Sequence, residues 1–192
     1  APSSPSRRAP GRPQPTERRP RARPTRSRRA PPEYYDRPLE FRRDVVGAAS
    51  VHHLCKSMVM ENTKAPAEVT GCEDPRLSKY YMIVVQYTAR LSAEKIKDFV
   101  FKLADGALPK RKINLRLAPQ EVSDELTGYR HNAVSPMACR TQIPIIMSDR
   151  IAALQPDFFF LGAGEVDLKV GLSAADFIAR YKPFVIDCTY NE

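Results

Sequence analysis

Hydrophobic positions between residues 33 and 192 follow the spacings of short strands and helices. Runs of β-branched and aromatic residues, or alternation of apolar and polar residues, predict strands, and apolar residues three or four positions apart predict helices. The pattern predicts strands at 80–88, 113–117, 144–148, 157–164, 166–172 and 183–187. It predicts helices or helical turns at 93–104, 119–126, 149–154 and 174–181. Residues 51–60 fit either a helix or a helix that passes into a strand.

The ends of these elements carry capping residues. Ser92 and Ser173 precede two of the helices, where a serine hydroxyl can accept a hydrogen bond from a free backbone N–H. Gly106 and Gly128 follow helices, where glycine readily adopts the left-handed conformation that ends them. The two strands that flank the glycine turn near 162–165 predict a hairpin.

Many short strands mixed with three or four helices indicate an α+β domain. The most continuous apolar run is the strand at 80–88. Together with Phe158–Phe160, Ile145 and Ile146, it is expected to supply the core.

Residues 1–32 lack this hydrophobic pattern altogether. They contain no Val, Ile, Leu, Met, Phe, Tyr or Trp, and they hold nine of the 18 prolines and ten arginines against a single acidic residue. Such a segment has no apolar surface to bury against the entropy of ordering. The remaining residues carry 21 basic and 21 acidic side chains, so the formal charge of +9 belongs to the tail. We therefore divide the chain into an extended basic arm (1–32), a connector (33–44) and a domain (45–192).

The arm has the chemistry of a polyanion ligand. Its guanidinium groups suit phosphate oxygens, and its binding to RNA should weaken with salt. A matrix-targeting helix is excluded by the prolines, whereas a solvated linker is an alternative. The expected partner is RNA, either rRNA or tRNA, and the acidic surface of tubulin is the second choice. The expected RNA-binding residues are Arg7, Arg8, Arg12, Arg18, Arg19, Arg21, Arg23, Arg26, Arg28 and Arg29.

Neither a metal nor a cofactor is expected. The four cysteines form no C-x-x-C pair, and the three histidines do not complete a zinc spacing. We expect free thiols in a reducing compartment. No window approaches 18 consecutive apolar residues, so we expect no membrane partner, and no apolar segment typical of a secretory signal precedes the domain.

Three segments in succession carry a family resemblance. They are HHLCKSMVM (52–60), TGYRHNAVSP (127–136) and IPIIMSDRIAAL (143–154), the last followed by LGAGEVDLKVGLSAADFI (161–178). Over roughly residues 45–189 the chain resembles the YbaK/ProX family of aminoacyl-tRNA deacylases and prolyl-tRNA-synthetase-associated editing domains, in its eukaryotic branch. The resemblance implies a mixed, barrel-like β-sheet with helices around it. It also implies a pocket for the aminoacylated 3′ end of tRNA.

The resemblance also implies roles for residues. Lys56 matches the family's essential lysine, which would orient the ester and stabilise the oxyanion as water attacks. The segment 128–136 matches the substrate loop, although Asn132 stands where the family has glycine. His131 beside it is a candidate general base, and its alternative is a loop histidine bonded to backbone. The residues expected to bind substrate are Gly128, Asn132, Ser135, Pro136, Gly162 and Gly164.

The hairpin also contains two glycines and two charged residues whose roles have to be considered. Gly162 and Gly164 would present backbone amides to the aminoacyl group, or they simply form a tight turn. The G-x-G pattern lacks the third glycine and the following helix of a dinucleotide site, which excludes a Rossmann interpretation. Asp167 and Lys169 alternate with apolar residues and are expected on the solvent face of the strand.

Three functions compete on this reading. The arm favours an RNA-binding structural subunit of a large ribonucleoprotein, with neighbouring proteins as partners. A mitochondrial ribosome, and hence a mitochondrial location, is the leading version. One alternative is an active trans-editing deacylase, with a cytoplasmic location. The other is a structural component of a ciliary microtubule assembly. Whether the domain is an enzyme is left open.

Overall fold

The computed structural model describes residues 24–190, which form two β-sheets with five α-helices around them. The larger sheet has the order β4-β2-β3-β5-β8, in which β2 is antiparallel to β3 and β4, and the pairs β3–β5 and β5–β8 are parallel. Its strands are β2 (Cys55–Asn62), β3 (Tyr80–Gln86), β4 (Leu115–Leu117), β5 (Ile145–Ser148) and β8 (Phe184–Ile186).

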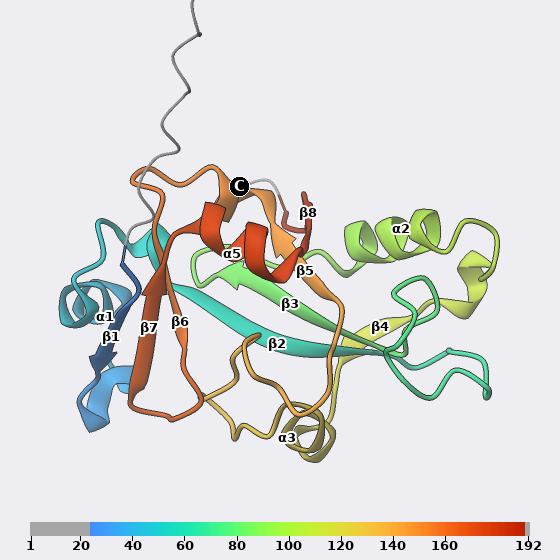
Figure 1. Cartoon of the computed structure of the whole chain (residues 1–192), viewed down its shortest axis with the longest axis horizontal. Helices are drawn as coiled ribbons and strands as arrows, with labels where there is room; N and C mark the ends of the chain where they lie inside the picture. Colours follow the sequence, from blue (N-terminus) through green and yellow to red (C-terminus); the bar gives the residue numbers. More distant parts are fainter. Residues whose placement is uncertain (1–23, 191–192) are drawn as a thin grey trace, which may run out of the picture.

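The smaller sheet is antiparallel throughout, in the order β1-β7-β6. Its strands are β1 (Arg26–Arg29), β6 (Phe159–Gly162) and β7 (Leu168–Leu172). A parallel bridge between Leu54 and Phe160 joins the two sheets. Figure 1 shows β1 and the β6–β7 hairpin at one end of the molecule, and α2 and β4 at the other.

The predicted serines begin two of the helices and Gly128 ends a third, whereas α2 ends at Leu103, before the expected Gly106. The helices are α1 (Leu39–Val46), α2 (Ala93–Leu103), α3 (Gln120–Thr127), α4 (Asp149–Ala152) and α5 (Ala174–Tyr181), with short 3-10 turns η1 (Pro32–Asp36), η2 (Val51–His53) and η3 (Lys110–Lys112). Ser92 accepts from the Lys95 amide and Ser173 from the Asp176 amide, and Gly128 ends α3 at φ +79°. Of the two interpretations of 51–60, the second is correct in outline, because the turn η2 passes into strand β2.

Strand β3 lies at the centre of the core and is buried on both faces. Tyr81, Ile83 and Val85 pack with Ile96 and Val100 of α2. On the opposite face, Met82 packs near α3, and Val84 packs with residues of α4 and α5. The predicted core residues Phe158, Phe159, Phe160 and Ile146 are buried, and Ile145 is half-buried. The α+β class and the expected mixed β-sheet with helices around it are confirmed.

The last part of the expected arm belongs to the folded body. Residues 26–29 pair with β7, and Ala30 is only 7% exposed within a cluster that includes Tyr34 and Phe160. The side chains of these four residues are polar and exposed. The local sequence therefore carries no hydrophobic signal for this strand. The expected RNA-binding arginines from Arg7 to Arg23 lie outside the described residues.

The three remaining arginines of that set lie on β1. Arg29 forms ion pairs with Glu165 and Asp167, and the Arg26 guanidinium stacks 5.6 Å from the centroid of Phe158. Arg26 and Arg29 therefore contact the domain itself, and the expected role of the three arginines in RNA binding stays a prediction.

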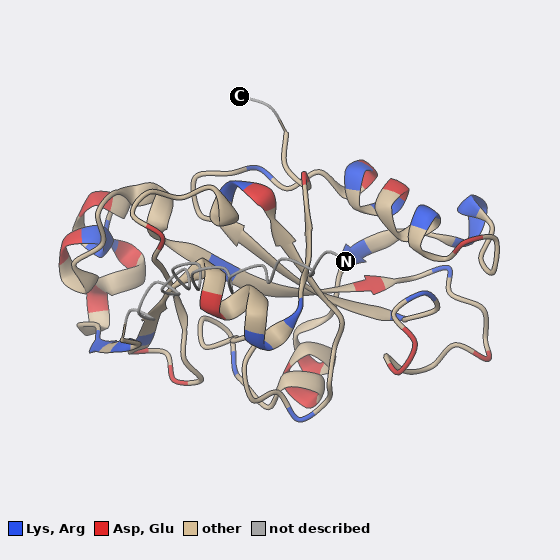
Figure 2. Ribbon diagram, turned by 45° about the horizontal axis from the view of Figure 1, so that its top comes forward, with Lys and Arg blue, Asp and Glu red and all other residues tan. Residues whose placement is uncertain are grey.

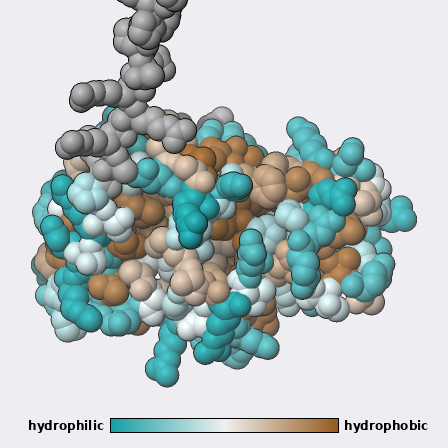
Figure 3. All heavy atoms as spheres, in the orientation of Figure 1, coloured by the Kyte–Doolittle hydropathy of each residue, from teal (hydrophilic) through white to brown (hydrophobic). Residues whose placement is uncertain are grey.

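The surface of the body mixes charges of both signs. Figure 2 marks acidic residues on α3 and both acidic and basic residues along α2. Figure 3 shows hydrophobic atoms gathered in the region of α5 and β8, where Tyr181 and Val185 are partly exposed. Within residues 24–190 no helix combines the length and apolar character that a membrane crossing requires.

Candidate functional site

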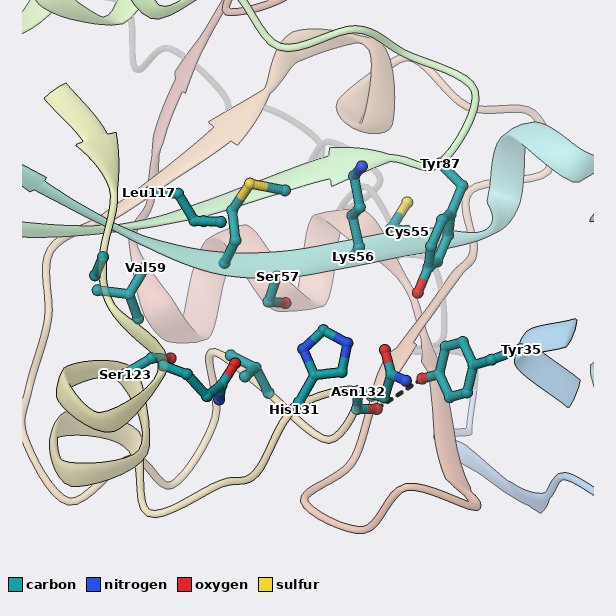
Figure 4. A pocket seen from close by; sticks show the side chains of 15 residues that line it. Tyr35, Cys55, Lys56, Ser57, Val59, Tyr87, Leu117, Ser123, His131 and Asn132 are labelled. Atoms are coloured by element: carbon teal, nitrogen blue, oxygen red, sulfur yellow. Dashed lines mark hydrogen bonds between the residues drawn. The ribbon is translucent and has the colours of Figure 1, made fainter. Parts of the chain in front are cut away.

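A pocket of about 250 Å³ opens along strand β2. Its walls come from β2, the N-terminal part of α3, the turn at 131–134, Gly162 of β6, and two tyrosines, Tyr35 and Tyr87. The pocket thus brings together Lys56, His131, Asn132 and Gly162 from the set expected from sequence. Figure 4 shows the His131 ring beneath β2, between Ser57 and Asn132.

The pocket lies on an unpaired stretch of the edge of β2. The bonds from Tyr87 N to the Leu54 carbonyl and from Asn62 N to the Lys79 carbonyl show that even-numbered residues of β2 bond to β3. Because successive residues of a strand direct their backbone groups to opposite edges, Ser57 directs its N–H and C=O away from β3. On that edge β4 pairs only with residues 60–62, and Ala118 N donates to the Val59 carbonyl.

Ser57 supplies a second polar group at this edge. Its Oγ is buried and has no hydrogen-bond partner among the described residues. A buried hydroxyl left without a partner costs free energy, so a ligand in the pocket that bonds to it would gain stability. The open edge and the hydroxyl together form a polar strip that borders the apolar side chains of Val59 and Val134.

Lys56 leaves β2 on the side opposite to Ser57, as alternate strand residues do (Figure 4). Its Nζ lies 5.7 Å from the ring centroid of Tyr87. Within residues 24–190 no carboxylate approaches Lys56 closely enough to form a salt bridge. Lys56 is a half-buried residue whose ammonium faces the Tyr87 ring, so it is available to pair with an anionic group of a ligand.

The residues 130–133 form a tight turn that carries His131 and Asn132 at its tip. Ala133 N donates to the Arg130 carbonyl at 2.9 Å, and Asn132 has φ +65°. Positive φ at the third position of a turn favours glycine or asparagine. Asparagine therefore meets the conformational requirement at the position where glycine was expected, and its carbonyl accepts from Tyr35 Oη at 2.6 Å.

The hairpin glycines pack against this turn. A Cβ on Gly162 would come within 2.9 Å of the Val134 carbonyl oxygen, and one on Gly164 within 2.9 Å of the Tyr129 ring. Gly164 N donates to the Ala133 carbonyl, so this amide is not available for an aminoacyl group. Of the two readings of the pair, the tight turn describes Gly164, whereas Gly162 also borders the pocket.

Three other expected substrate residues lie away from the pocket lining. Gly128 is the C-cap of α3. Ser135 is 2% exposed, and its hydroxyl accepts from Met137 N. Pro136 is buried beside it. Ser135 and Pro136 are buried and shape the loop from within, whereas Gly128 is exposed at the end of α3.

The expectation for Lys169 is wrong. Its side chain is not on a solvent face: the residue is 3% exposed, and its Nζ donates to Tyr35 Oη at 2.8 Å and to the Val166 carbonyl at 2.6 Å. Burial lowers the pKa of Lys169 to about 8. The alternation placed Lys169 on one face correctly, but the segment that covers this face, η1, was not predicted.

Tyr35, Tyr87 and Arg42 were also missed. The Arg42 guanidinium lies 5.5 Å from the Tyr35 ring centroid and 5.4 Å from that of Tyr87, and it donates to the Tyr35 carbonyl. Tyr35 and Tyr87 line the pocket. For Tyr35 and Arg42 the sequence signal is the cluster of aromatic residues and arginines at 34–43, which lies in the predicted connector.

Metal and thiol chemistry find no support in this part of the chain. Among residues 24–190 no three His, Cys, Asp or Glu side chains converge on a common point that could hold a metal. The four cysteines are free thiols. Burial raises the pKa of Cys139 to about 11 and that of Cys188 to about 12, which keeps both protonated at neutral pH.

Neither a protein-family model nor a curated protein matches the sequence. Several solved structures do match the fold. A candidate trans-editing enzyme for prolyl-tRNA synthetase has TM-score 0.66 and 19% identity over 87% of each chain. A scaffold protein from a computational epitope-grafting study has TM-score 0.66 and 16% identity over 88% of each chain. The hypothetical protein APE2540 has TM-score 0.62 and 16% identity over 87% of this chain and 92% of its own. The chain therefore has the fold of a trans-editing-type domain.

Proposed function

We propose that the protein hydrolyses the ester that joins an amino acid to the 3′ end of tRNA. The observation that carries the proposal is the pocket on the open edge of β2, whose lining includes Lys56, Ser57, His131 and Asn132. A domain kept only as a scaffold needs no open strand edge, no unpartnered buried hydroxyl and no half-buried lysine without a carboxylate partner.

The two sides of the β2 edge suggest how the substrate lies. The phosphate of the tRNA end pairs with Lys56 beside Tyr87, and the ester crosses the edge to the side of Ser57. There the Ser57 N–H donates to the carbonyl oxygen and stabilises the oxyanion when water attacks. His131 accepts a proton from the attacking water. The bond between the acyl carbon and the ribose oxygen then breaks, and His131 returns the proton to the ribose oxygen.

The basic arm fits the same proposal, because arginine-rich segments add affinity for RNA phosphates without sequence preference. The competing proposal is a structural role in a ribonucleoprotein such as a mitochondrial ribosome, and the charge of the arm is the observation that favours it. A place in a ciliary microtubule assembly is a weaker alternative, since no feature of the described residues favours it over RNA.

The test is a deacylation assay with the full chain on alanyl, seryl and cysteinyl esters of the tRNAs for proline and cysteine. We expect turnover of at least one ester, and we expect Lys56→Ala to lower kcat/KM at least tenfold, mainly through KM, because Lys56 binds the phosphate. Lys64→Ala, on an exposed loop outside the pocket, is the matched control and should match the wild type.

His131→Ala separates the chemical step from binding. It should lower kcat by roughly a hundredfold with little change in KM. A folded protein that hydrolyses none of these esters above background would overturn the proposal and support the structural role.

A further inference from the structure

Three interactions hold the turn that carries His131 and Asn132. Two are between backbone groups: Ala133 N with the Arg130 carbonyl, and Gly164 N with the Ala133 carbonyl. The third comes from a side chain 97 residues away, the Tyr35 hydroxyl, which donates to the Asn132 carbonyl at 2.6 Å. Figure 4 shows this bond at the end of the pocket.

Tyr35 is itself held firmly in place. Its ring packs edge-on against Tyr34 at 5.2 Å between centroids, and its carbonyl accepts from Arg42 at 2.6 Å. Its hydroxyl oxygen accepts from the buried Lys169 ammonium. An ammonium can only donate. The single hydroxyl hydrogen of Tyr35 is therefore left for the Asn132 carbonyl.

We propose that Tyr35 is a positioning residue of the site: its hydroxyl, oriented by the Lys169 ammonium, holds the Asn132 carbonyl and so fixes the His131–Asn132 turn against the open edge of β2. Tyr35 lies in η1, between the basic arm and the segments that carry the resemblance, so the connector segment becomes part of the site. Its effect on turnover rests on the proposed hydrolysis, but its effect on the turn does not.

The orientation depends on the charge of Lys169. The charged and titratable groups around its ammonium are Asp167 in its own hairpin, Arg42 from α1, and Tyr34 and Tyr35 from η1. Once Lys169 loses its proton, its nitrogen gains a lone pair that competes with the Asn132 carbonyl for the hydroxyl hydrogen of Tyr35. The hydrogen bond from Tyr35 to the Asn132 carbonyl should therefore weaken as the pH rises through about 8, the pKa of Lys169.

The test uses Tyr35→Phe in the full chain, because this variant keeps the ring and removes only the hydroxyl. We expect amide hydrogen exchange at residues 130–134 to become about tenfold faster, the effect of losing one hydrogen bond. Tyr181→Phe, which alters a partly exposed tyrosine outside the pocket, should leave exchange there unchanged. Exchange in Tyr35→Phe equal to the wild type, in a folded protein, would overturn the proposal.

Two further readouts separate positioning from mere packing. The pKa of Lys169, followed by NMR, should fall in Tyr35→Phe because the ammonium loses an acceptor; an unchanged pKa would contradict the contact. Lys169→Met should also accelerate exchange at 130–134, and a failure to do so would overturn the orienting role of Lys169.

The turnover readout depends on the proposed function. The kcat for ester hydrolysis should fall about tenfold in Tyr35→Phe with KM nearly unchanged. The wild-type kcat should decline above pH 8, whereas the kcat of Tyr35→Phe should not show that decline. If the wild type hydrolyses no ester, the proposed function fails, while the exchange and NMR measurements still decide the role of Tyr35.

Discussion

Replacing Lys169 by methionine should change how stability depends on pH. The folded protein holds the pKa of this lysine at about 8, against an ordinary value of 10.5, because burial disfavours the charged form. The unfolded chain therefore binds more protons than the folded one between these two values, and stability must rise with pH in that window. Below pH 8 the group costs stability, and above 10.5 the cost is gone.

The size of the effect follows from the shift. At about 1.36 kcal/mol for each pKa unit, the full cost is about 3 kcal/mol, or about 2 kcal/mol when residual solvent screening is allowed for. Between pH 7 and pH 9.5 the wild type should gain about 1 to 2 kcal/mol from this group. At pH 7 the methionine variant should differ little from the wild type, because relief of this cost is offset by two lost hydrogen bonds of about 1 kcal/mol each.

The assay is urea unfolding of both proteins at pH 7 and pH 9.5. The quantity of interest is the difference between the two pH slopes, because other titrating groups contribute equally to both proteins. Lys102→Met, at an exposed position on α2, should reproduce the wild-type slope. If Lys169→Met has the same slope as the wild type, the lysine is not buried as described.

Three further outcomes test the fold. Removing residues 1–23 should weaken RNA binding at about 0.1 M salt and leave the melting temperature unchanged. Removing residues 1–32 should also lower the melting temperature, because β1 and its contacts are lost. Equal melting temperatures of the two truncated proteins would contradict the pairing of β1. Val85→Asp should unfold the domain, since Val85 is 0% exposed and a buried carboxylate there has no partner; a cooperative melt at the wild-type temperature would show that β3 is misplaced. Ser92→Ala should cost about 1 kcal/mol in chemical denaturation through loss of the α2 N-cap, and an unchanged midpoint would exclude that cap.

Elements whose signal lies in their own residues could be predicted from sequence. The apolar run at 80–88 is strand β3, and the serine and glycine caps locate α2, α3 and α5 because capping acts within a few residues. The β6–β7 hairpin followed from alternation on both sides of a glycine turn. For the site, the segments that carry Lys56, His131 and Gly162 were found, because the resemblance rests on those segments.

Elements that depend on a distant partner could not be predicted. The sequence RSRR of β1 becomes a strand because β7 offers an unpaired edge, and no local property of four polar residues reports that. Lys169 has the same difficulty: alternation puts it on one face of β7, but whether that face meets water depends on η1, more than 130 residues earlier. Ser57 gave no signal, since its importance comes from which edge of β2 is left open.

Strand β1 also protects the small sheet from pairing with a second molecule. Unpaired strand edges recruit further strands, and natural proteins protect them with charge. The edge of β7 is covered by β1, which carries three exposed arginines, Arg26, Arg28 and Arg29. A second molecule that approached this edge would bring its own arginines against them, so repulsion opposes the growth of the sheet. A truncation that removes β1 would uncover the β7 edge and leave the hairpin open to aggregation.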